Sequence, residues 1–261
     1  MAYQHLITRR DAGVERLILN RADVRNAFNN RMIAELTAWA GDIAADAGVR
    51  VVVISGAGPT FCAGADVGWM AKTVDYTEAE NLADACAASR MFAAIDQLPA
   101  PVIGRVHGAA IGGGAGLTAV CDVVVAEEHA TFGFTEVKLG LIPAVISPFV
   151  LAKIGRSAAR ELFLTGRRFT AEHALDIGLV HTVVPPEHLD AAVDAVVREL
   201  LSAGPEAVAA VKRLIVDIEA ADRTQVSAMT ATALAKRRVS AEGQEGLRAF
   251  LQKRKPGWDR T

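Results

Sequence analysis

Four glycines, at positions 112, 113, 114 and 116, lie in the most apolar stretch of the chain, Ala109–Ala126, where Asp122 is the single charged residue. A stretch of this length approaches that of a membrane-spanning helix. The glycines, the central acid and the missing basic flank argue against such a span. Glycine has no Cβ atom, so its backbone can come close to another segment or a ligand. We therefore expect a buried core element with close backbone contacts.

The size and charge of the chain limit what this element can belong to. A chain of 261 residues buries about three quarters of its unfolded surface, so it needs no disulfide or metal for stability. Its 28 basic and 30 acidic residues give a net charge of −2, which argues against a nucleic-acid surface. The three cysteines lack framework spacing and no apolar signal region follows Met1, so we expect a reduced, cytoplasmic setting.

Hydrophobic periodicity predicts alternating strands and helices through the first two thirds of the chain. Strands are expected at 13–20, 49–56, 101–106, 122–126 and 130–134, and helices at 29–43, 78–97, 156–165 and 171–177. Beyond Pro185 and Pro186 only helices are expected, at 189–201, 205–221, 225–239 and 243–253. The fold class is therefore α/β, with residues 1–186 as a core domain and 187–261 as a C-terminal helical region suited to packing on a neighbour.

The glycine segment also matches the dinucleotide-binding pattern G-x-G-x-x-A at Gly114–Ala119. The context argues against a dinucleotide site, because almost no helix fits before the strand expected at 122–126. No Gly-Lys-Ser/Thr follows to make a phosphate-binding loop, and no Gly-x-Ser-x-Gly elbow is present. The six histidines lack the spacing of a metal site.

Two loop-to-helix junctions, Ala63–Asp66 and Gly112–Gly114, each follow a predicted strand. Helix starts carry unpaired N–H groups and the positive end of the helix dipole, so two of them facing each other could bind one developing oxyanion. Alternatively, the glycines only relieve packing between strand and helix. The pattern alone favours neither interpretation.

Several motifs follow one another in a specific order. They are Phe-Cys-Ala-Gly-Ala-Asp at 61–66, His-Gly-Ala-Ala-Ile-Gly-Gly-Gly at 107–114, Cys-Asp at 121–122, Phe-Gly-Phe-Thr-Glu-Val-Lys-Leu-Gly-Leu-Ile-Pro at 132–143, Leu-Thr-Gly-Arg-Arg-Phe-Thr-Ala at 164–171 and Gly-Leu-Val at 178–180. This set resembles the enoyl-CoA hydratase/isomerase (crotonase) family over residues 5–255. The resemblance implies a crotonase-like spiral of ββα turns that binds acyl-CoA, with a C-terminal all-helical trimerisation region, in a homotrimer or a dimer of trimers.

The resemblance also implies a catalytic set. The oxyanion donors would be the backbone N–H groups of Ala65 and Gly113, and one such donor typically supplies about 2.7–4 kcal/mol of transition-state stabilisation. Hydratases of the family use two glutamates, and the second matches Glu136. The first belongs two residues after the glycine triplet, where this chain has Gly116. One acid is therefore missing, and Gly116 marks its place.

This missing acid leaves three hypotheses. The first is hydration of a 2-enoyl-CoA, branched or carboxylated, because the motifs around Gly116 and Glu136 resemble a bacterial methylglutaconyl-CoA hydratase subgroup. A single glutamate also resembles Δ3,Δ2-enoyl-CoA isomerases, where one base moves a proton between carbons. The third is an acyl-CoA-binding protein without catalysis. Arg105 could pair with a substrate carboxylate, or form a structural ion pair at a subunit contact. His107 could transfer a proton, but a turn residue is the preferred interpretation.

Coenzyme A contacts carry over from the same resemblance. The acyl-CoA substrate is expected to contact Asp23, Val24, Arg25, Ala27, Ala63, Asp66, Val67 and Gly112, with Arg25 reaching a phosphate. Phe250 and Lys253 resemble residues that touch CoA held by an adjacent subunit, although a basic C-terminus is commonly just solvated. No cofactor is expected, since the CoA thioester is the substrate, and no metal, nucleic-acid or membrane partner is expected.

Overall fold

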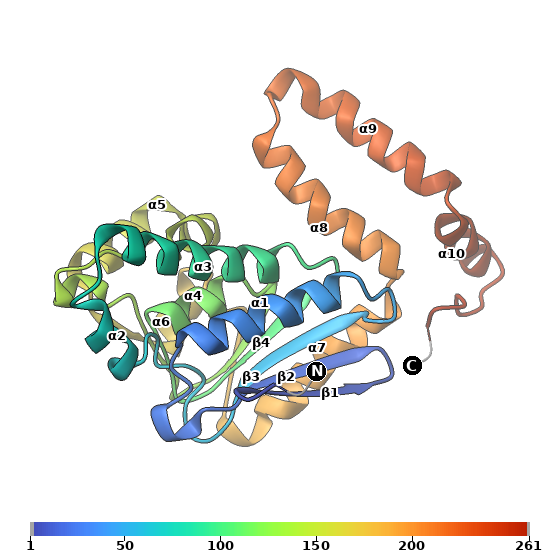
Figure 1. The fold of residues 1–261 in the computed structure, drawn as a ribbon. Helices are drawn as coiled ribbons and strands as arrows, with labels where there is room; N and C mark the ends of the chain where they lie inside the picture. Colours follow the sequence, from blue (N-terminus) through green and yellow to red (C-terminus); the bar gives the residue numbers. More distant parts are fainter. Residues whose placement is uncertain (1–2, 260–261) are drawn as a thin grey trace.

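The computed structural model describes residues 3–259, and a six-stranded sheet lies at its centre (Figure 1). The strands run in the order β1-β2-β3-β4-β6-β9. Their bounds are β1 Leu6–Asp11, β2 Val14–Leu19, β3 Val51–Gly56, β4 Val102–Val106, β6 Val123–Glu127 and β9 Thr182–Val184. The first two strands pair antiparallel and the others pair parallel. The Val/Ile-rich runs of β3, β4 and β6 suit a parallel sheet, whose strands are buried on both faces.

A second, three-stranded sheet carries the glycine segment. It consists of β5 Ala109–Ile111, β7 Thr131–Gly133 and β8 Arg168–Thr170. The helix α4 (Gly113–Ala119) begins directly after β5. The succession β4, β5, α4 is one strand-strand-helix turn, and β6 and β7 begin the next. The predicted α/β class and spiral of ββα turns are confirmed.

Two long helices cover one face of the large sheet (Figure 1). In α1 (Asn30–Ala44) the residues Met32, Leu36, Trp39 and Ile43 recur at steps of three and four and are all buried. The Asn29 side chain caps this helix by accepting the Met32 N–H at 2.9 Å. The neighbouring α3 (Glu78–Asp96) begins with a capping box. Along the chain, the short helix α2 (Val67–Thr73) comes directly before α3.

The helix α7 (Leu189–Ser202) covers the opposite face of the sheet. Its side chains Leu189, Val193 and Val197 are buried against Val53 and Val125 of the strands. This packing makes α7 part of the core, although it follows the predicted boundary between residues 186 and 187. The division into two domains stays a prediction.

Two helices near the second sheet complete the body. One, α5 (Ser147–Thr165), begins earlier than the predicted start at Arg156, because Gly155 joins two helical stretches with a φ of 71°. The other, α6 (Ala171–Asp176), lies as predicted. Three 3-10 helices are η1 Ala22–Val24, η2 Glu136–Leu139 and η3 Pro186–His188.

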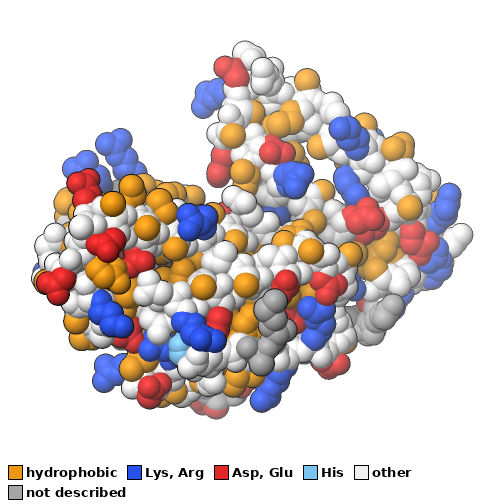
Figure 2. All heavy atoms as spheres, viewed as in Figure 1, with side chains coloured by type: hydrophobic (Ala, Val, Ile, Leu, Met, Phe, Trp, Pro, Cys, Tyr) orange, Lys and Arg blue, Asp and Glu red, His pale blue; other side chains and the backbone are white. Residues whose placement is uncertain are grey.

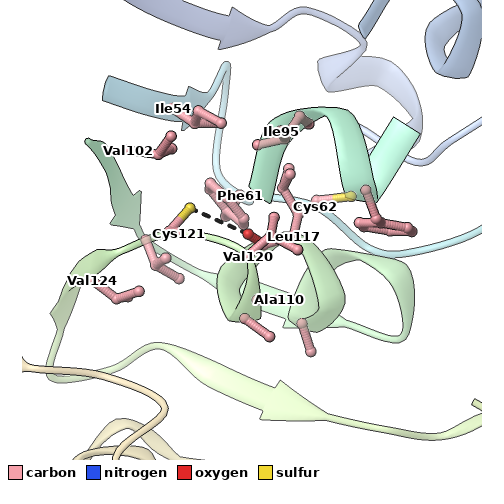
Figure 3. Packing of buried hydrophobic residues seen from close by; sticks show 14 of the residues in the cluster. Ile54, Phe61, Cys62, Ile95, Val102, Ala110, Leu117, Val120, Cys121 and Val124 are labelled. Carbon is pink, nitrogen blue, oxygen red and sulfur yellow. Dashed lines mark hydrogen bonds between the residues drawn. The ribbon is translucent and has the colours of Figure 1, made fainter. Parts of the chain in front are cut away.

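Two of the three cysteines are part of the core. Figure 3 shows Cys62 and Cys121 packed among apolar side chains, with the Cys121 thiol donating to the carbonyl oxygen of Leu117 at 3.2 Å. Burial raises the pKa of each of these thiols to about 12. Both are therefore protonated and unreactive at neutral pH.

The last three helices form an arm that stands away from the body (Figure 1). They are α8 Pro205–Ala220, α9 Arg223–Val239 and α10 Ala241–Leu251. Within the described chain, α8 and α9 contain no buried residue. Figure 2 shows hydrophobic side chains on the surface of the arm, and those exposed include Val211, Ile215, Val216, Leu234, Leu247, Phe250 and Leu251.

A charged contact fastens this arm to the core. Lys212 of α8 lies 2.7 Å from the carboxylate of Asp122, which also accepts the backbone N–H of Val102 at 2.7 Å. None of the helices in residues 3–259 is long and apolar enough to cross a membrane.

We predict that Lys212→Met lowers the free energy of unfolding by about 2 kcal/mol, because it leaves the half-buried Asp122 carboxylate without its cation. Urea denaturation followed by circular dichroism at one protein concentration measures the change. The matched control is Lys236→Met on the exposed surface of α9, for which we expect almost no effect. Equal loss in both variants would contradict the role given to the Lys212–Asp122 pair.

Candidate active site

The loop at residues 61–66 is held between two other segments of the chain. On one side, Cys62 donates its backbone N–H to the carbonyl of Ala109 in β5 at 3.0 Å. On the other side, Phe28 donates to the carbonyl of Gly64 at 2.7 Å, and Asp66 donates to the carbonyl of Phe28 at 2.9 Å. The loop therefore has the fixed geometry of an added strand.

Close backbone packing brings this loop against the start of α4. A Cβ atom on Gly114 would lie 2.1 Å from the carbonyl oxygen of Cys62, and one on Gly64 would lie 2.7 Å from that of Ile111 and 3.6 Å from the nitrogen of Gly113. Only glycine fits at these distances, and Gly64 also has a φ of +90°. The glycines therefore serve strand-helix packing, and the same packing brings the two predicted oxyanion-binding junctions together.

Both junctions have a free backbone donor. Within residues 3–259, the amides of Ala65 and Gly113 donate to no other residue. For Gly113 this follows from its place as the first residue of α4, where helical N–H groups have no intrahelical acceptor.

A cavity of about 290 Å³ joins these amides to the predicted acid. Ala65, Gly113 and Glu136 all line it. The other lining residues are apolar: Phe28, Ile33, Trp69, Ala85, Ala88, Met91, Phe92, Ile142, Pro143, Ala144, Val145 and Ile146. Glu136 is thus the one titratable side chain among the residues described around this cavity.

One oxygen of the Glu136 carboxyl is buried without a hydrogen-bond partner in the described chain. Glu136 begins η2, and its Oε1 lies 3.3 Å from the place a Cβ on Gly112 would occupy. The oxygen without a partner is Oε2. Burial raises the pKa of this carboxyl above its usual range. A carboxyl with a raised pKa can both accept and return a proton near neutral pH.

The structure shows what occupies the place of the acid that is missing at Gly116. Gly116 is buried inside α4 and does not line the cavity. A Cβ on Gly116 would lie 2.2 Å from Cγ2 of Ile146 and 3.5 Å from the ring of Phe92. The space left by the missing acid is filled by the Ile146 side chain, which arrives from a different part of the chain.

The structure brings the two predicted CoA-binding segments side by side. Ala63 donates its N–H to the carbonyl of Arg25 at 3.0 Å. Arg25 is exposed and has the left-handed backbone conformation at the end of η1. The side chains of the preceding residues Asp23 and Val24 are also exposed. Ala27 is buried, and among the remaining predicted contacts Val67 is exposed and Gly112 is buried.

Asp66 has a structural role that the sequence analysis did not identify. Its carboxylate caps α2 by accepting the Trp69 N–H at 3.1 Å and forms an ion pair with Arg21 at 2.7 Å. Arg21 and the capped helix border a second cavity of about 430 Å³, which shares Trp69 with the first. Three of its lining residues are cations. The full lining is Arg21, Asn29, Asn30, Arg31, Asp66, Gly68, Trp69 and Lys72.

Arg105 and His107 lie away from the cavity. The Arg105 guanidinium forms an ion pair with Asp190 of α7 at 2.5 Å and contacts His107 Nδ1 at 3.2 Å. His107 Nε2 lies 2.9 Å from the carbonyl oxygen of Gly58. Within the described chain Arg105 therefore forms a structural ion pair and does not line the cavity, and His107 lies in the short connection between β4 and β5.

The C-terminal candidates lie on the arm. Phe250 is 81% exposed on α10, and Lys253 follows the end of that helix (Figure 1). Neither lines the cavity of its own chain. In the part of the chain that the structure describes, no group of three His, Cys, Asp or Glu side chains could hold a metal ion.

Sequence reasoning missed the apolar walls of the cavity. Ala88, Met91 and Phe92 line it from α3, and their three-to-four spacing marks one face of that helix. Phe28 and Ile146 come from loops without periodicity. No sequence signal therefore indicated that these two residues lie near Gly116 and Gly113.

Comparison with known proteins gives matches along nearly the whole chain. A family model described as enoyl-CoA hydratase/isomerase matches residues 9–261. The crystal structure of an enoyl-CoA hydratase from Shewanella pealeana has a TM-score of 0.94 and 38% identity, covering 98% of this chain and 96% of that one. For an enoyl-CoA hydratase from Mycobacterium smegmatis the TM-score is 0.92 and the identity 35%, covering 97% and 98%. Enoyl-CoA hydratase domain-containing protein 3, mitochondrial, of Danio rerio is 31% identical over 255 residues, 98% of this chain and 88% of the relative.

We predict that Glu136→Gln raises the melting temperature at neutral pH. Because burial raises the pKa of Glu136, its ionisation opposes folding, so its contribution to stability is lost as pH rises through the folded-state pKa. The neutral glutamine avoids this loss, and its advantage disappears as pH falls below the ordinary carboxyl value of 4.5. Melting temperatures of the wild type and Glu136→Gln, measured from below pH 4.5 to neutral pH, test this prediction. The control is Glu199→Gln on the exposed face of α7. A pH-independent difference would contradict the burial argument.

Proposed function

The chain belongs to the enoyl-CoA hydratase/isomerase family and is an enzyme of the hydratase-type lyase kind, and from that premise we propose that it hydrates a 2-enoyl-CoA thioester with Glu136 as its single acid–base residue. One observation carries the proposal: Ala65 and Gly113, whose amides have no acceptor within the described residues, line the same apolar cavity as Glu136. No cofactor takes part in this reaction, since the CoA thioester is the substrate.

The proposed reaction uses the proton of the added water. With the thioester oxygen at the two amides, Glu136 takes a proton from water as the hydroxyl group adds to C3 of the substrate. The electron pair of the double bond moves onto the thioester oxygen, and the amides stabilise this enolate. The same carboxyl then gives its proton to C2. One carboxyl thus takes part in forming both new bonds, from oxygen to C3 and from hydrogen to C2. Both bonds form on the same face of the double bond.

An apolar acyl chain suits this cavity best. Its lining contains no cation in the described residues, and Glu136 is the one polar side chain besides Trp69. A carboxylated acyl group would leave its charge unpaired beside Glu136, which is costly in an apolar site. Methylglutaconyl-CoA therefore remains a hypothesis for which Arg105 gives no support, because Asp190 already pairs with that guanidinium.

The neighbouring cavity supports a place for the charged part of coenzyme A. Arg21, Arg31 and Lys72 line it, and phosphate groups bind such cations. Asp66 pairs with Arg21 and Glu35 pairs with Arg31, so a phosphate would share these two guanidinium groups with carboxylates. This cavity shares Trp69 with the acyl cavity, so one ligand could extend through both. Arg25 is exposed nearby on the predicted CoA-binding loop and remains a candidate phosphate ligand.

We also propose that the chain forms a homotrimer or a dimer of trimers through its arm. The exposed apolar side chains of α8, α9 and α10 support this, because a helix without a buried face gains stability by packing on a partner. In such an assembly Phe250 and Lys253 could reach the CoA of an adjacent subunit. The cytoplasmic setting expected from the sequence stays a prediction.

We predict that Glu136→Gln lowers hydratase kcat/KM by about 100-fold or more, the usual contribution of a general acid–base residue. Binding of a saturated acyl-CoA should stay within a few fold, because glutamine keeps the shape of the cavity. The rate is measured with crotonyl-CoA, and Glu199→Gln is the matched control. A variant that keeps most of the wild-type rate would rule out Glu136 as the acid–base residue.

The same assay separates the alternatives. The wild-type enzyme is incubated in deuterated water with 2-enoyl-CoA and, separately, with 3-enoyl-CoA. Hydration predicts a 3-hydroxyacyl product with deuterium at C2. Conversion of 3-enoyl to 2-enoyl product without hydration would instead identify an isomerase. Tight binding without product or deuterium exchange would identify a binding protein.

For the assembly, we predict that Val211→Asp combined with Ile215→Asp lowers the molar mass in solution from a multiple of three chains to that of one chain, 27.5 kDa. Charges on this exposed apolar face of α8 would be buried without partners in an oligomer. Light scattering after gel filtration measures the mass. Glu219→Lys on the same helix changes the charge without removing apolar surface, and an unchanged mass for the double variant would exclude α8 from the contact.

A further inference from the structure

Ile146 lines the cavity that contains Glu136 and also packs against α4 at Gly116. It is 3% exposed. Its Cγ2 occupies the space where a side chain at position 116 would begin, 2.2 Å from the place of a Cβ atom there. The ring of Phe92 closes the same space at 3.5 Å. Position 116 can therefore carry no side chain while Ile146 is present in this conformation.

The position of Ile146 is fixed relative to the carboxyl. Leu141 donates its N–H to the backbone carbonyl of Glu136 at 3.1 Å, so the segment between Glu136 and Ile146 begins with a closed turn. The segment ends at α5, where the carbonyl of Ile146 accepts the N–H of Val150 at 3.1 Å. The Ile146 backbone is therefore held at the start of α5, and its buried side chain forms part of the cavity wall.

We propose that Ile146 is a specificity-determining residue of this enzyme, acting with Gly116 as a matched pair. The isoleucine side chain takes the space of a second acid–base group and limits the width of the acyl chain beside Glu136. This inference rests on the proposed hydration of 2-enoyl-CoA and extends it to the substrate class. The wild-type cavity takes slender, uncharged acyl groups, and bulky or branched ones require the space that Ile146 fills.

The steric part follows from packing. Replacing Ile146 by alanine removes three carbon atoms from a buried wall and leaves space that the rigid neighbours cannot fill. A substrate methyl or methylene group that enters such a space changes selectivity by roughly 10- to 200-fold. The loss of isoleucine should therefore improve bulky substrates relative to small ones.

The first test compares kcat/KM of wild type and Ile146→Ala for crotonyl-CoA, a 3-methyl-branched 2-enoyl-CoA and methylglutaconyl-CoA. We expect the ratio of branched to crotonyl kcat/KM to rise at least about 10-fold in the variant. Ile142→Ala is the matched control, because Ile142 lines the same cavity from the same segment but is 73% exposed. An unchanged ratio in Ile146→Ala, or an equal rise in Ile142→Ala, would overturn the proposal.

The second test addresses the matched pair. We expect Gly116→Glu alone to lower the melting temperature and abolish activity, because its Cβ meets Ile146. The double variant Gly116→Glu with Ile146→Ala should recover stability beyond the sum of the two single changes. Strictly additive melting temperatures, measured with activity for all four proteins, would show that the two positions act independently and would overturn the pairing.

The outcomes also separate this inference from the proposed function. If the wild-type enzyme hydrates no 2-enoyl-CoA, the proposed function fails. Calorimetric binding of saturated straight and branched acyl-CoA thioesters would still measure the effect of Ile146→Ala on acyl-group selectivity. If the wild-type enzyme hydrates 2-enoyl-CoA but Ile146→Ala selects acyl groups as the wild type does, in both rate and binding, the role of Ile146 fails alone.

Discussion

The close approach of two backbone segments determines the geometry of this protein's site. The carbonyl of Cys62 lies so near the start of α4 that a Cβ on Gly114 would be 2.1 Å away. The loop at 61–66 is hydrogen bonded to β5 on that side and to Phe28 on the other. Both segments are held by backbone hydrogen bonds and close packing, and Ala65 and Gly113 line one cavity.

Burial then gives the single acid its character. Glu136 lies in an apolar cavity with Oε2 unpaired and its pKa raised, a cost to stability that a functional site can carry. The amides opposite it are equally without partners within the described residues. These unsatisfied groups suit a reaction in which charge develops on the substrate between them. The buried thiols of Cys62 and Cys121 are protonated and have packing roles only.

Local patterns were sufficient for most of the fold. The strands β2, β3, β4, β6 and β7 and the long helices other than α5 lie within a few residues of their predicted places, because hydrophobic periodicity and capping residues act locally. The short strands β5, β8 and β9 were missed, since three-residue strands carry almost no periodicity. The edge strand β1 was missed because only Leu6 of its six residues is buried. The early start of α5 was missed because Gly155 interrupts its helical pattern.

The α/β class followed from periodicity, and the catalytic candidates Ala65, Gly113 and Glu136 followed from the family resemblance, because each lies in a short motif whose residues are neighbours in the chain. Tertiary structure alone decided what surrounds them. Ile146 fills the place beside Gly116, thirty residues earlier, and Asp190 pairs with Arg105 from a distant helix. The reason is physical: a cavity wall and an ion pair depend on side chains that only the folded packing brings within van der Waals or hydrogen-bond distance.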